Sequence, residues 1–340
     1  MGSASLHNTT LISAQVVEMP AAREAILRTL SYFDIFYYPL TAVEIMQFMG
    51  QKSNETDLHE ALTHLLKEKK IFLRNGFFSI QDNPLLAHRR KEGNRRAEAM
   101  LKKANQIGKF LFRFPFVRAV GISGSLSKNY ADERSDIDFF IITKANRLWI
   151  SRTCMHLYKK LTFITGRQHY FCMNYYIDEK SLSLPEKDIF TAIEIKTLLP
   201  VSGGVTMRQF FDSNDWTSDW LPACAERKQV EPDPRYTWLK NMVEWLLNGR
   251  FGDKLDNSLM RLTQRRWKHK TEKGKKNIKG DLMGLISDKH YAWSNPGNFR
   301  EKVLELYKHK SAAYNHTPKG KDFSFQLSEP DYIPHRNIRT

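Results

Sequence analysis

The segment 123-SGSLSKNYADERSDIDFFIIT-143 constrains the fold most, because two acidic residues lie at the start of an apolar run. Alternate residues of a β-strand point to the same face, so Asp136 and Asp138 project together while Ile137 points away. Two adjacent carboxylates repel each other and are costly to remove from water. A divalent cation relieves both costs, and carboxylate oxygens suit Mg²⁺ or Mn²⁺. Because magnesium often shares its ligand shell with phosphates, the segment predicts a metal–nucleotide site.

The Gly-Ser pair that precedes these acids predicts a phosphate-binding turn. It follows an expected strand over 117–123, and Gly124 allows the backbone to turn tightly and approach a ligand. If a helix starts at Ser125, its first N–H groups and its dipole favour an anion, and the hydroxyl adds a donor. Ser127 and Lys128 lie in the same turn. We therefore expect Gly124, Ser125, Ser127 and Lys128 to bind the nucleotide.

This tract resembles the signature of the nucleotidyltransferase superfamily typified by DNA polymerase beta, a Gly-Ser pair followed after a short spacer by Asp-x-Asp. The spacer here is 126–135, and the resemblance covers roughly residues 117–200. It implies an enzyme that transfers an NMP from a nucleoside triphosphate to an acceptor hydroxyl and releases pyrophosphate. Asp136 and Asp138 would be its catalytic, metal-binding residues, and a second metal would activate the acceptor hydroxyl.

The sequence departs from this superfamily at the third acidic position, which its members usually place on a later strand. The matching strand is expected over 170–177, where the inward polar residue is Asn174. An amide oxygen can ligate a metal but adds no negative charge, so it would hold the metal more weakly. Three interpretations stay open: Asp178, Glu179 or Glu194 supplies the acid, the acceptor needs little activation, or a degenerate site binds nucleotides or nucleic acid without turnover.

Length and composition indicate a basic protein of several domains. The 340 residues are enough for two or three domains, and a hydrophobic content of 41% argues against a largely disordered chain. The net charge of +16 indicates acidic partners, namely nucleic acid, nucleotides or an anionic surface, or else a basic protein that has no polyanionic partner. The three cysteines form no Cys-x-x-Cys pair, so we expect neither a disulfide framework nor a structural zinc site.

Targeting signals are absent from the N-terminal residues, which lack the charged start and apolar core of a signal peptide. No apolar run approaches the ~18 residues that a membrane span needs. We therefore expect a cytoplasmic protein that has no membrane partner.

The first part of the chain is expected to hold a small helical module. Residues 1–19 are predicted to form a poorly ordered lead-in, and residues 20–82 a winged-helix-like domain of three helices and a hairpin. The hairpin is predicted because Asn75-Gly76 separates two short apolar runs. The third helix, over about 55–69, mixes acids and lysines on its outer face, a poor surface for DNA phosphates. DNA binding and a packing or protein-contact role both remain open.

The remaining chain is divided by charge and periodicity. A basic linking helix is expected over 83–116, the nucleotidyltransferase core over 117–204, a helical region over 205–317, and an extended tail over 318–340. A strand, a helix and two further strands in the core predict an α+β fold, in which a mixed sheet is flanked by the winged helix and the C-terminal helices.

Two basic segments are candidates for binding an acceptor. Residues 89–118 carry ten Arg or Lys, and residues 265–279 carry eight against one Glu. Either segment could line a groove for RNA, DNA or a nucleoside triphosphate, or could be a solvated basic face. Trp267 offers a ring on which a base could stack. The excess positive charge favours RNA or another polyanionic acceptor, while a protein hydroxyl or a small molecule such as an aminoglycoside remains an alternative.

Overall fold

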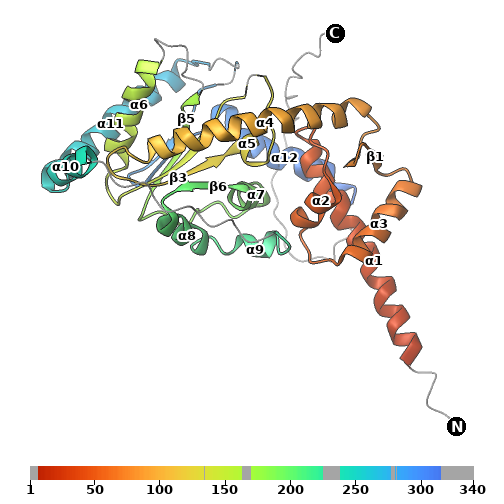
Figure 1. Ribbon diagram of the computed structural model, residues 1–340. Coiled ribbons are helices and arrows are strands. Elements are labelled where there is room, and N and C mark those ends of the chain that lie inside the picture. Colours follow the sequence, from red (N-terminus) through yellow and green to blue (C-terminus); the bar gives the residue numbers. More distant parts are fainter. Residues whose placement is uncertain are drawn as a thin grey trace.

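The computed structural model describes residues 7–133, 135–162, 170–224, 238–276, 280 and 282–314, with side chains from residue 21 onward. Figure 1 shows a helical N-terminal unit beside a larger unit built on a sheet, with the long helix α4 (Pro84–Leu111) running from one to the other. The predicted tail over 318–340 lies outside the described residues.

The N-terminal unit contains three helices followed by a hairpin, in the order that was expected. Its elements are α1 (His7–Asp34), α2 (Ala42–Phe48), α3 (Glu55–Lys67), β1 (Phe72–Arg74) and β2 (Phe77–Ser79). Asn75 and Gly76 form the hairpin turn with φ of +51° and +83°, the left-handed region that suits these two residues. α1 starts at His7, inside the expected lead-in over 1–19. The winged-helix identity of this unit stays a prediction.

A mixed six-stranded sheet forms the centre of the larger unit, as the predicted α+β class requires. Its strands are β3 (Val117–Ser123), β4 (Asp138–Thr143), β5 (Cys172–Asp178), β6 (Leu199–Ser202), β7 (Leu285–Ser287) and β8 (Tyr291–Ser294), in the spatial order β6-β3-β4-β5-β8-β7. β4 and β5 pair in parallel, and the other neighbours pair antiparallel.

Two strands of this sheet come from the region over 205–317, where only helices were expected. β8 pairs with β5, and β7 forms the outer edge. The strands span only three and four residues, too short for alternation to show in the sequence. Their place depends on contacts across the sheet, since the Trp293 ring stacks on the Tyr175 ring at 5.0 Å. Pro200 lies in β6 at the other edge of the sheet, where a residue without a backbone N–H is tolerated.

Helices cover both faces of the sheet. The remaining elements are α5 (Gly124–Ser127), α6 (Leu148–Thr162), α7 (Ile189–Thr197), α8 (Gly204–Asp212), α9 (Thr217–Trp220), α10 (Trp238–Leu246), α11 (Arg250–Glu272), the 3-10 helix η2 (Pro296–Asn298) and α12 (Phe299–Ala312). α4, α6 and α11 contribute Leu111, Trp149 and Leu259 to the core on one face. α7 and α8 contribute Ile195 and Phe210 on the other.

A third core joins the N-terminal unit to the sheet unit. It includes Tyr32 of α1, Ile193 of α7 and Val303 of α12. Lys310 of α12 also forms an ion pair with the buried carboxylate of Asp34, at 2.6 Å. The shared core shows that the two units pack as one body, and α12 contacts both of them. Among the described helices, none combines the length and the apolar content needed to cross a membrane.

Part of the basic helix expected over 83–116 serves this packing. The guanidinium of Arg90 in α4 is almost fully buried and lies 3.7 Å from the ring centre of Tyr38. It forms an ion pair with Glu44 at 2.6 Å and donates a hydrogen bond to the carbonyl of Pro39 at 2.8 Å. Arg90 is therefore not available to an acceptor, although its charge contributed to the basic pattern in the sequence.

Candidate functional site

The Gly-Ser turn lies directly beside the Asp-x-Asp segment. β3 and β4 pair so that Ser123 is opposite Asp138, which brings the turn after β3 to the start of β4. Gly124 has φ of +70°, and a Cβ built on it would lie 2.7 Å from Oδ2 of Asp138. A side chain at this position would therefore collide with the carboxylate, and the positive φ also favours glycine. The structure thus joins the two halves of the motif into one site.

Asp136 and Asp138 are partly exposed, whereas Ile137 between them is fully buried in the core. β4 begins at Asp138, so Asp136 lies in the extended segment just before it. The alternation places the apolar residue inside and leaves both acids at the surface, at the end of the sheet that carries the Gly-Ser turn.

Asn174 is brought next to Asp138 by an irregularity in β5. The pairing of β4 with β5 shifts between Phe139 and Phe140, which leaves Asn174 as an extra residue in its strand. Its Nδ2 donates a hydrogen bond to Oδ1 of Asp138 at 2.7 Å. The residue at the expected third acidic position therefore contacts Asp138, but with a neutral amide in place of a carboxylate.

Cys172 is a neighbour of this site that the sequence did not indicate. It is the strand partner of Asp138, and its Sγ donates a hydrogen bond to Oδ1 of Asn174 at 3.2 Å. Burial, and next the negative charge of Asp138, raise the pKa of Cys172 to about 12. The thiol therefore stays protonated at neutral pH and orients the Asn174 amide. The parallel register of β4 and β5, which the sequence does not reveal, is the only signal that places it here.

Two of the three alternative acids lie at the wrong end of the sheet. Asp178 pairs with Thr143 at the far end of β4, roughly 17 Å from Asp138 at about 3.3 Å per residue. It is fully buried and accepts hydrogen bonds from the backbone N–H of Asn146 and from His290. Glu179 accepts a bond from the backbone N–H of Ala145. Asp178 and Glu179 therefore bind backbone N–H groups of the loop after β4 and are remote from Asp136 and Asp138.

The third alternative, Glu194 of α7, lies at the Gly-Ser turn but already has a partner. Lys128 donates to Oε1 of Glu194 at 2.7 Å and to the carbonyl of Gly124 at 3.1 Å. Among the described residues, no three His, Cys, Asp or Glu side chains are placed to hold one metal ion. The acid set near the turn is thus Asp136 and Asp138, with Asn174 beside them.

The four residues expected to bind the nucleotide divide into two pairs. Ser127 is buried and donates to the carbonyl of Gly124 at 2.8 Å, and Lys128 is bonded as described, so both brace the turn from beneath. The hydroxyl of Tyr38 also donates to the carbonyl of Lys128, which ties the N-terminal unit to the turn. Ser125 is exposed, and α5 is a single turn whose first N–H groups have no partner within the helix. Gly124 and Ser125 therefore form the accessible part.

A basic groove of about 470 Å³ lies between α11 and the edge strand β7. The basic segment expected over 265–279 begins in the last turns of α11, and Arg261, Arg265, Lys268 and Trp267 line the groove. Glu272 lies among them and forms a long, exposed ion pair with Lys268. Neither Arg261 nor Arg265 has an ion-pair partner within the part of the chain that the structure describes.

This groove opens at the same end of the sheet as the acid pair. α11 starts near the far end, where Asp256 accepts a hydrogen bond from the N–H of Ile150, and descends until Thr271 bonds the carbonyl of Met283 just before β7. The strand registers place Leu285 of β7 near the level of Asn174. Leu285 lies three strand spacings from Asp138, roughly 14 Å across the sheet at about 4.8 Å each. The groove lies on the sheet face that α11 covers, whereas Asp138 shares its side of β4 with Phe140, on the face that α8 covers.

Comparison with known families gives a match in the central part of the chain. Residues 101–198 match the model of the nucleotidyltransferase domain family. The matched range runs from the second half of α4 to the end of α7 and includes the Gly-Ser turn, both acids and Asn174. No curated protein and no solved structure is significantly similar to the chain. The family match supports a general role in nucleotidyl transfer.

Proposed function

We propose that the protein transfers an NMP from a nucleoside triphosphate to an acceptor hydroxyl at the site formed by the Gly-Ser turn and the acid pair. The observation that carries the proposal is the approach of Gly124 to Asp138, where a Cβ would lie 2.7 Å from the carboxylate. One triphosphate can contact a phosphate-binding turn and a metal-binding carboxylate only if the two are adjacent. The match over 101–198 supports the same reaction class.

The residues at this site fit Mg²⁺ or Mn²⁺. Asp136 and Asp138 would supply carboxylate oxygens, and the Asn174 side chain, already bonded to Asp138, would supply an amide oxygen after its amide turns over. This small ligand set leaves coordination positions for waters and triphosphate oxygens, which magnesium usually keeps in its shell. When bound, the metal would neutralise charge that develops on the phosphates during in-line attack at the α-phosphate.

The chain's own residues would bind and orient the triphosphate. The backbone N–H groups at Gly124 and Ser125, together with the Ser125 hydroxyl, would cradle the β- and γ-phosphates. Ser127 and Lys128 would act on the nucleotide by holding the turn in shape, because both donate to the Gly124 carbonyl. Direct contact between Lys128 and a phosphate would require the ammonium to leave Glu194.

For the acceptor, we propose an RNA strand in the groove between α11 and β7. Arg261, Arg265 and Lys268 would contact its phosphates, and the half-exposed ring of Trp267 would stack on a base. The N-terminal unit, which we propose to be a winged helix, would serve as a packing module, because its core is shared with α7 and α12.

The test is transfer of label from each nucleoside triphosphate to total cellular RNA, in the presence of Mg²⁺ or Mn²⁺. Arg265→Glu in the groove is compared with Arg266→Glu, its exposed neighbour that does not line the groove. We expect Arg265→Glu to raise the KM for RNA about tenfold, while Arg266→Glu has a much smaller effect. An equal loss in both variants would indicate general attraction to a basic surface. Label on protein or small molecules alone would exclude RNA as acceptor.

A second candidate function is nucleotide binding without turnover, and the neutral Asn174 is the observation that favours it. A third carboxylate is missing among the described residues around Asp138, and the site consequently has less negative charge to hold a metal. The two candidates predict different responses to restoring the acid.

Asn174→Asp is expected to tighten Mn²⁺ binding about tenfold, because ligand charge sets the affinity of such sites. If the wild-type protein transfers label slowly, this substitution should raise the single-turnover rate. Mn²⁺ titration followed by electron paramagnetic resonance measures the affinity, and Asn105→Asp on the exposed side of α4 is the matched control. Nucleotide binding without transfer in both the wild type and Asn174→Asp would identify the binding module instead.

A further inference from the structure

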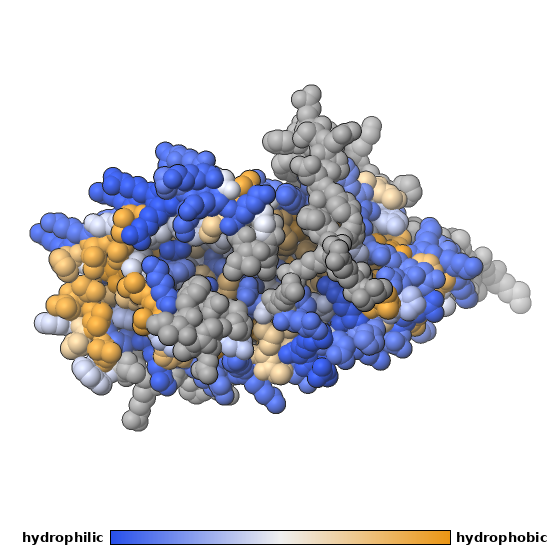
Figure 2. All heavy atoms as spheres, turned by 90° about the horizontal axis from the view of Figure 1, so that it is seen from above, coloured by the Kyte–Doolittle hydropathy of each residue, from blue (hydrophilic) through white to orange (hydrophobic). Residues whose placement is uncertain are grey.

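α10 has the opposite orientation to an ordinary surface helix, because its apolar side faces solvent. The α10 apolar face consists of Trp238, Leu239, Met242, Trp245 and Leu246, together with Phe251 at the start of α11. The two tryptophans are 75% and 80% exposed, and the other four side chains are at least half exposed. Figure 2 shows apolar residues gathered at the end of the molecule where Figure 1 places α10. Such a contiguous exposed apolar patch indicates an interaction site.

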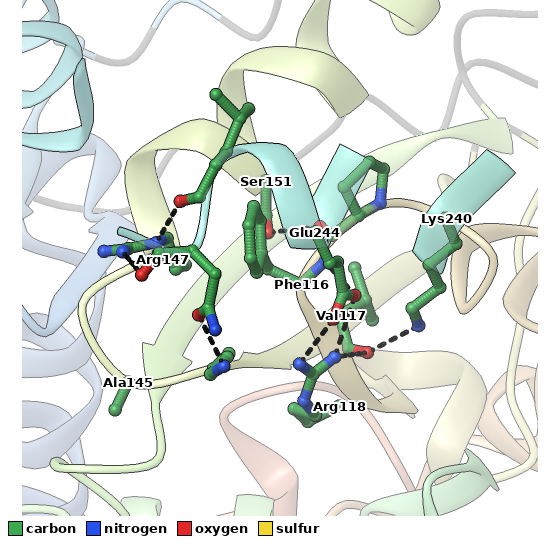
Figure 3. Close-up of polar contacts among 12 residues, drawn as sticks. Phe116, Val117, Arg118, Ala145, Arg147, Ser151, Lys240 and Glu244 are labelled. Carbon is green, nitrogen blue, oxygen red and sulfur yellow. Dashed lines mark hydrogen bonds and ion pairs between the residues drawn. The ribbon is translucent and has the colours of Figure 1, made fainter. Parts of the chain in front are cut away.

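The polar side of α10 is bonded to the end of the sheet, as Figure 3 shows. The ammonium of Lys240 is buried and donates to the carbonyls of Phe112 and Val117, both at 2.8 Å. Glu244 accepts two hydrogen bonds from Arg118, at 3.0 and 2.7 Å, and one from the N–H of Phe116 at 2.7 Å. Turning the helix over would leave a buried ammonium and a carboxylate without these partners, which is strongly unfavourable. The outward apolar face is therefore part of the fold.

The charges around the α10 apolar face are mainly positive. Arg113, in the loop beneath α10, and Arg250 and Lys254, in the first turns of α11, are exposed and have no acidic partner among the described residues. The neighbouring acids are neutralised, since Glu244 pairs with Arg118 and Asp253 pairs with Arg147. An apolar face surrounded by cations complements a surface that is negatively charged on the outside and apolar beneath.

We propose that the α10 apolar face binds the surface of an anionic lipid bilayer. Tryptophan, leucine and phenylalanine would enter the boundary between headgroups and acyl chains, and Arg113, Arg250 and Lys254 would contact anionic headgroups. A second copy of the chain is a poorer occupant, because a symmetric contact would bring these cations toward their own copies. At nine residues, α10 is too short to span a bilayer. The expectation of no membrane partner rested on the lack of a spanning segment, and a helix that lies on the bilayer surface does not need one.

This attachment would leave the nucleotide site in solution. α10 lies at the Val117 end of β3, whereas the Gly-Ser turn follows Ser123 at the other end. The strand spans seven residues, so the two sites are roughly 20 Å apart at about 3.3 Å per residue. The lipid-binding proposal does not rest on the proposed nucleotidyl transfer, and either can fail alone.

The experiment is co-sedimentation of the full chain with vesicles of phosphatidylcholine alone or mixed with phosphatidylglycerol. We expect binding to the mixed vesicles, weakened by salt and by Arg250→Glu with Lys254→Glu. Trp238→Ser with Trp245→Ser should lower the partition coefficient about tenfold or more. Trp220→Ser, a partly exposed tryptophan on α9, is the matched control and should bind as the wild type. Tryptophan emission of the wild type should shift to the blue with mixed vesicles only.

Absence of binding to both kinds of vesicle would overturn the proposal, whatever the behaviour of the variants. Self-association of the wild type, measured by light scattering, that disappears in Trp238→Ser with Trp245→Ser and competes with no vesicle would assign the face to a second copy. Binding that survives in the double-tryptophan variant at wild-type strength would show that general basic charge, and not the α10 apolar face, holds the lipid. The substituted tryptophans are exposed, so thermal unfolding should match that of the control.

Discussion

Asp138→Asn is expected to lower the rate of nucleotidyl transfer by about 10²-fold or more, because the charge that a metal stabilises in this reaction is worth several kcal/mol. The substitution removes a negative charge at the point where the Gly-Ser turn, Asp136 and Asn174 meet. The amide oxygen of the new asparagine can still accept the hydrogen bond from Nδ2 of Asn174, so the substitution removes the charge and keeps this contact. Single-turnover transfer at saturating nucleotide measures the loss, and the same loss is expected for Asp136→Asn.

The matched control for this prediction is Glu133→Gln, which removes an acidic charge from the same loop. The Glu133 side chain is 81% exposed and pairs with Arg96 on α4, away from the Gly-Ser turn. Transfer by this variant should remain near the wild-type rate. Thermal unfolding separates loss of chemistry from loss of fold. Full activity in Asp138→Asn would place the reaction elsewhere in the molecule.

Arg147→Ala is expected to lower the free energy of unfolding by about 1–3 kcal/mol, the usual cost of leaving buried polar groups without a hydrogen-bond partner. The Arg147 side chain is only 4% exposed and forms an ion pair with Asp253 at 2.5 Å. Its guanidinium also donates to the carbonyls of Leu247 and Asn248, at 2.9 and 2.7 Å, so it fastens the connection between α10 and α11 to the sheet (Figure 3). Alanine would leave these carbonyls and Asp253 without their donor.

Urea unfolding followed by tryptophan fluorescence measures this loss. Arg250→Ala, an exposed arginine in the same region, should change the free energy of unfolding by less than about 0.5 kcal/mol. Arg147→Lys keeps the charge but not the planar fork of donors, so an intermediate loss is expected. A change in Arg147→Ala no larger than that of the control would mean that the carbonyls find other donors.

The sequence predictions that agree with the structure rest on local patterns. The hairpin at Asn75-Gly76 follows from backbone preferences of two adjacent residues. The approach of the Gly-Ser turn to Asp138 follows from two consecutive strands joined by a short connection, which pair with each other most often. The position of Asn174 beside the acids was also expected from the alternation of β5, although the irregularity that directs its side chain was not.

Contacts between distant segments decided what the sequence missed. β7 and β8 are too short to show alternation, and they become strands because β5 offers an edge to pair with. Asp178, Glu179 and Glu194 are equally plausible third acids in the sequence. Only the direction of β5, which places Asp178 and Glu179 at the far end, and the bond from Lys128 to Glu194 separate them.

The sequence by itself determined that the Gly-Ser turn lies beside the Asp-x-Asp segment, because the two are close in the chain and strand periodicity governs both. Only the tertiary structure decided which face of α10 meets solvent. Helical periodicity shows that one side of α10 is apolar and the other polar, and the usual expectation buries the apolar side. Here Lys240 and Glu244 find buried partners at the end of β3, more than a hundred residues away, and their bonds turn the tryptophans outward.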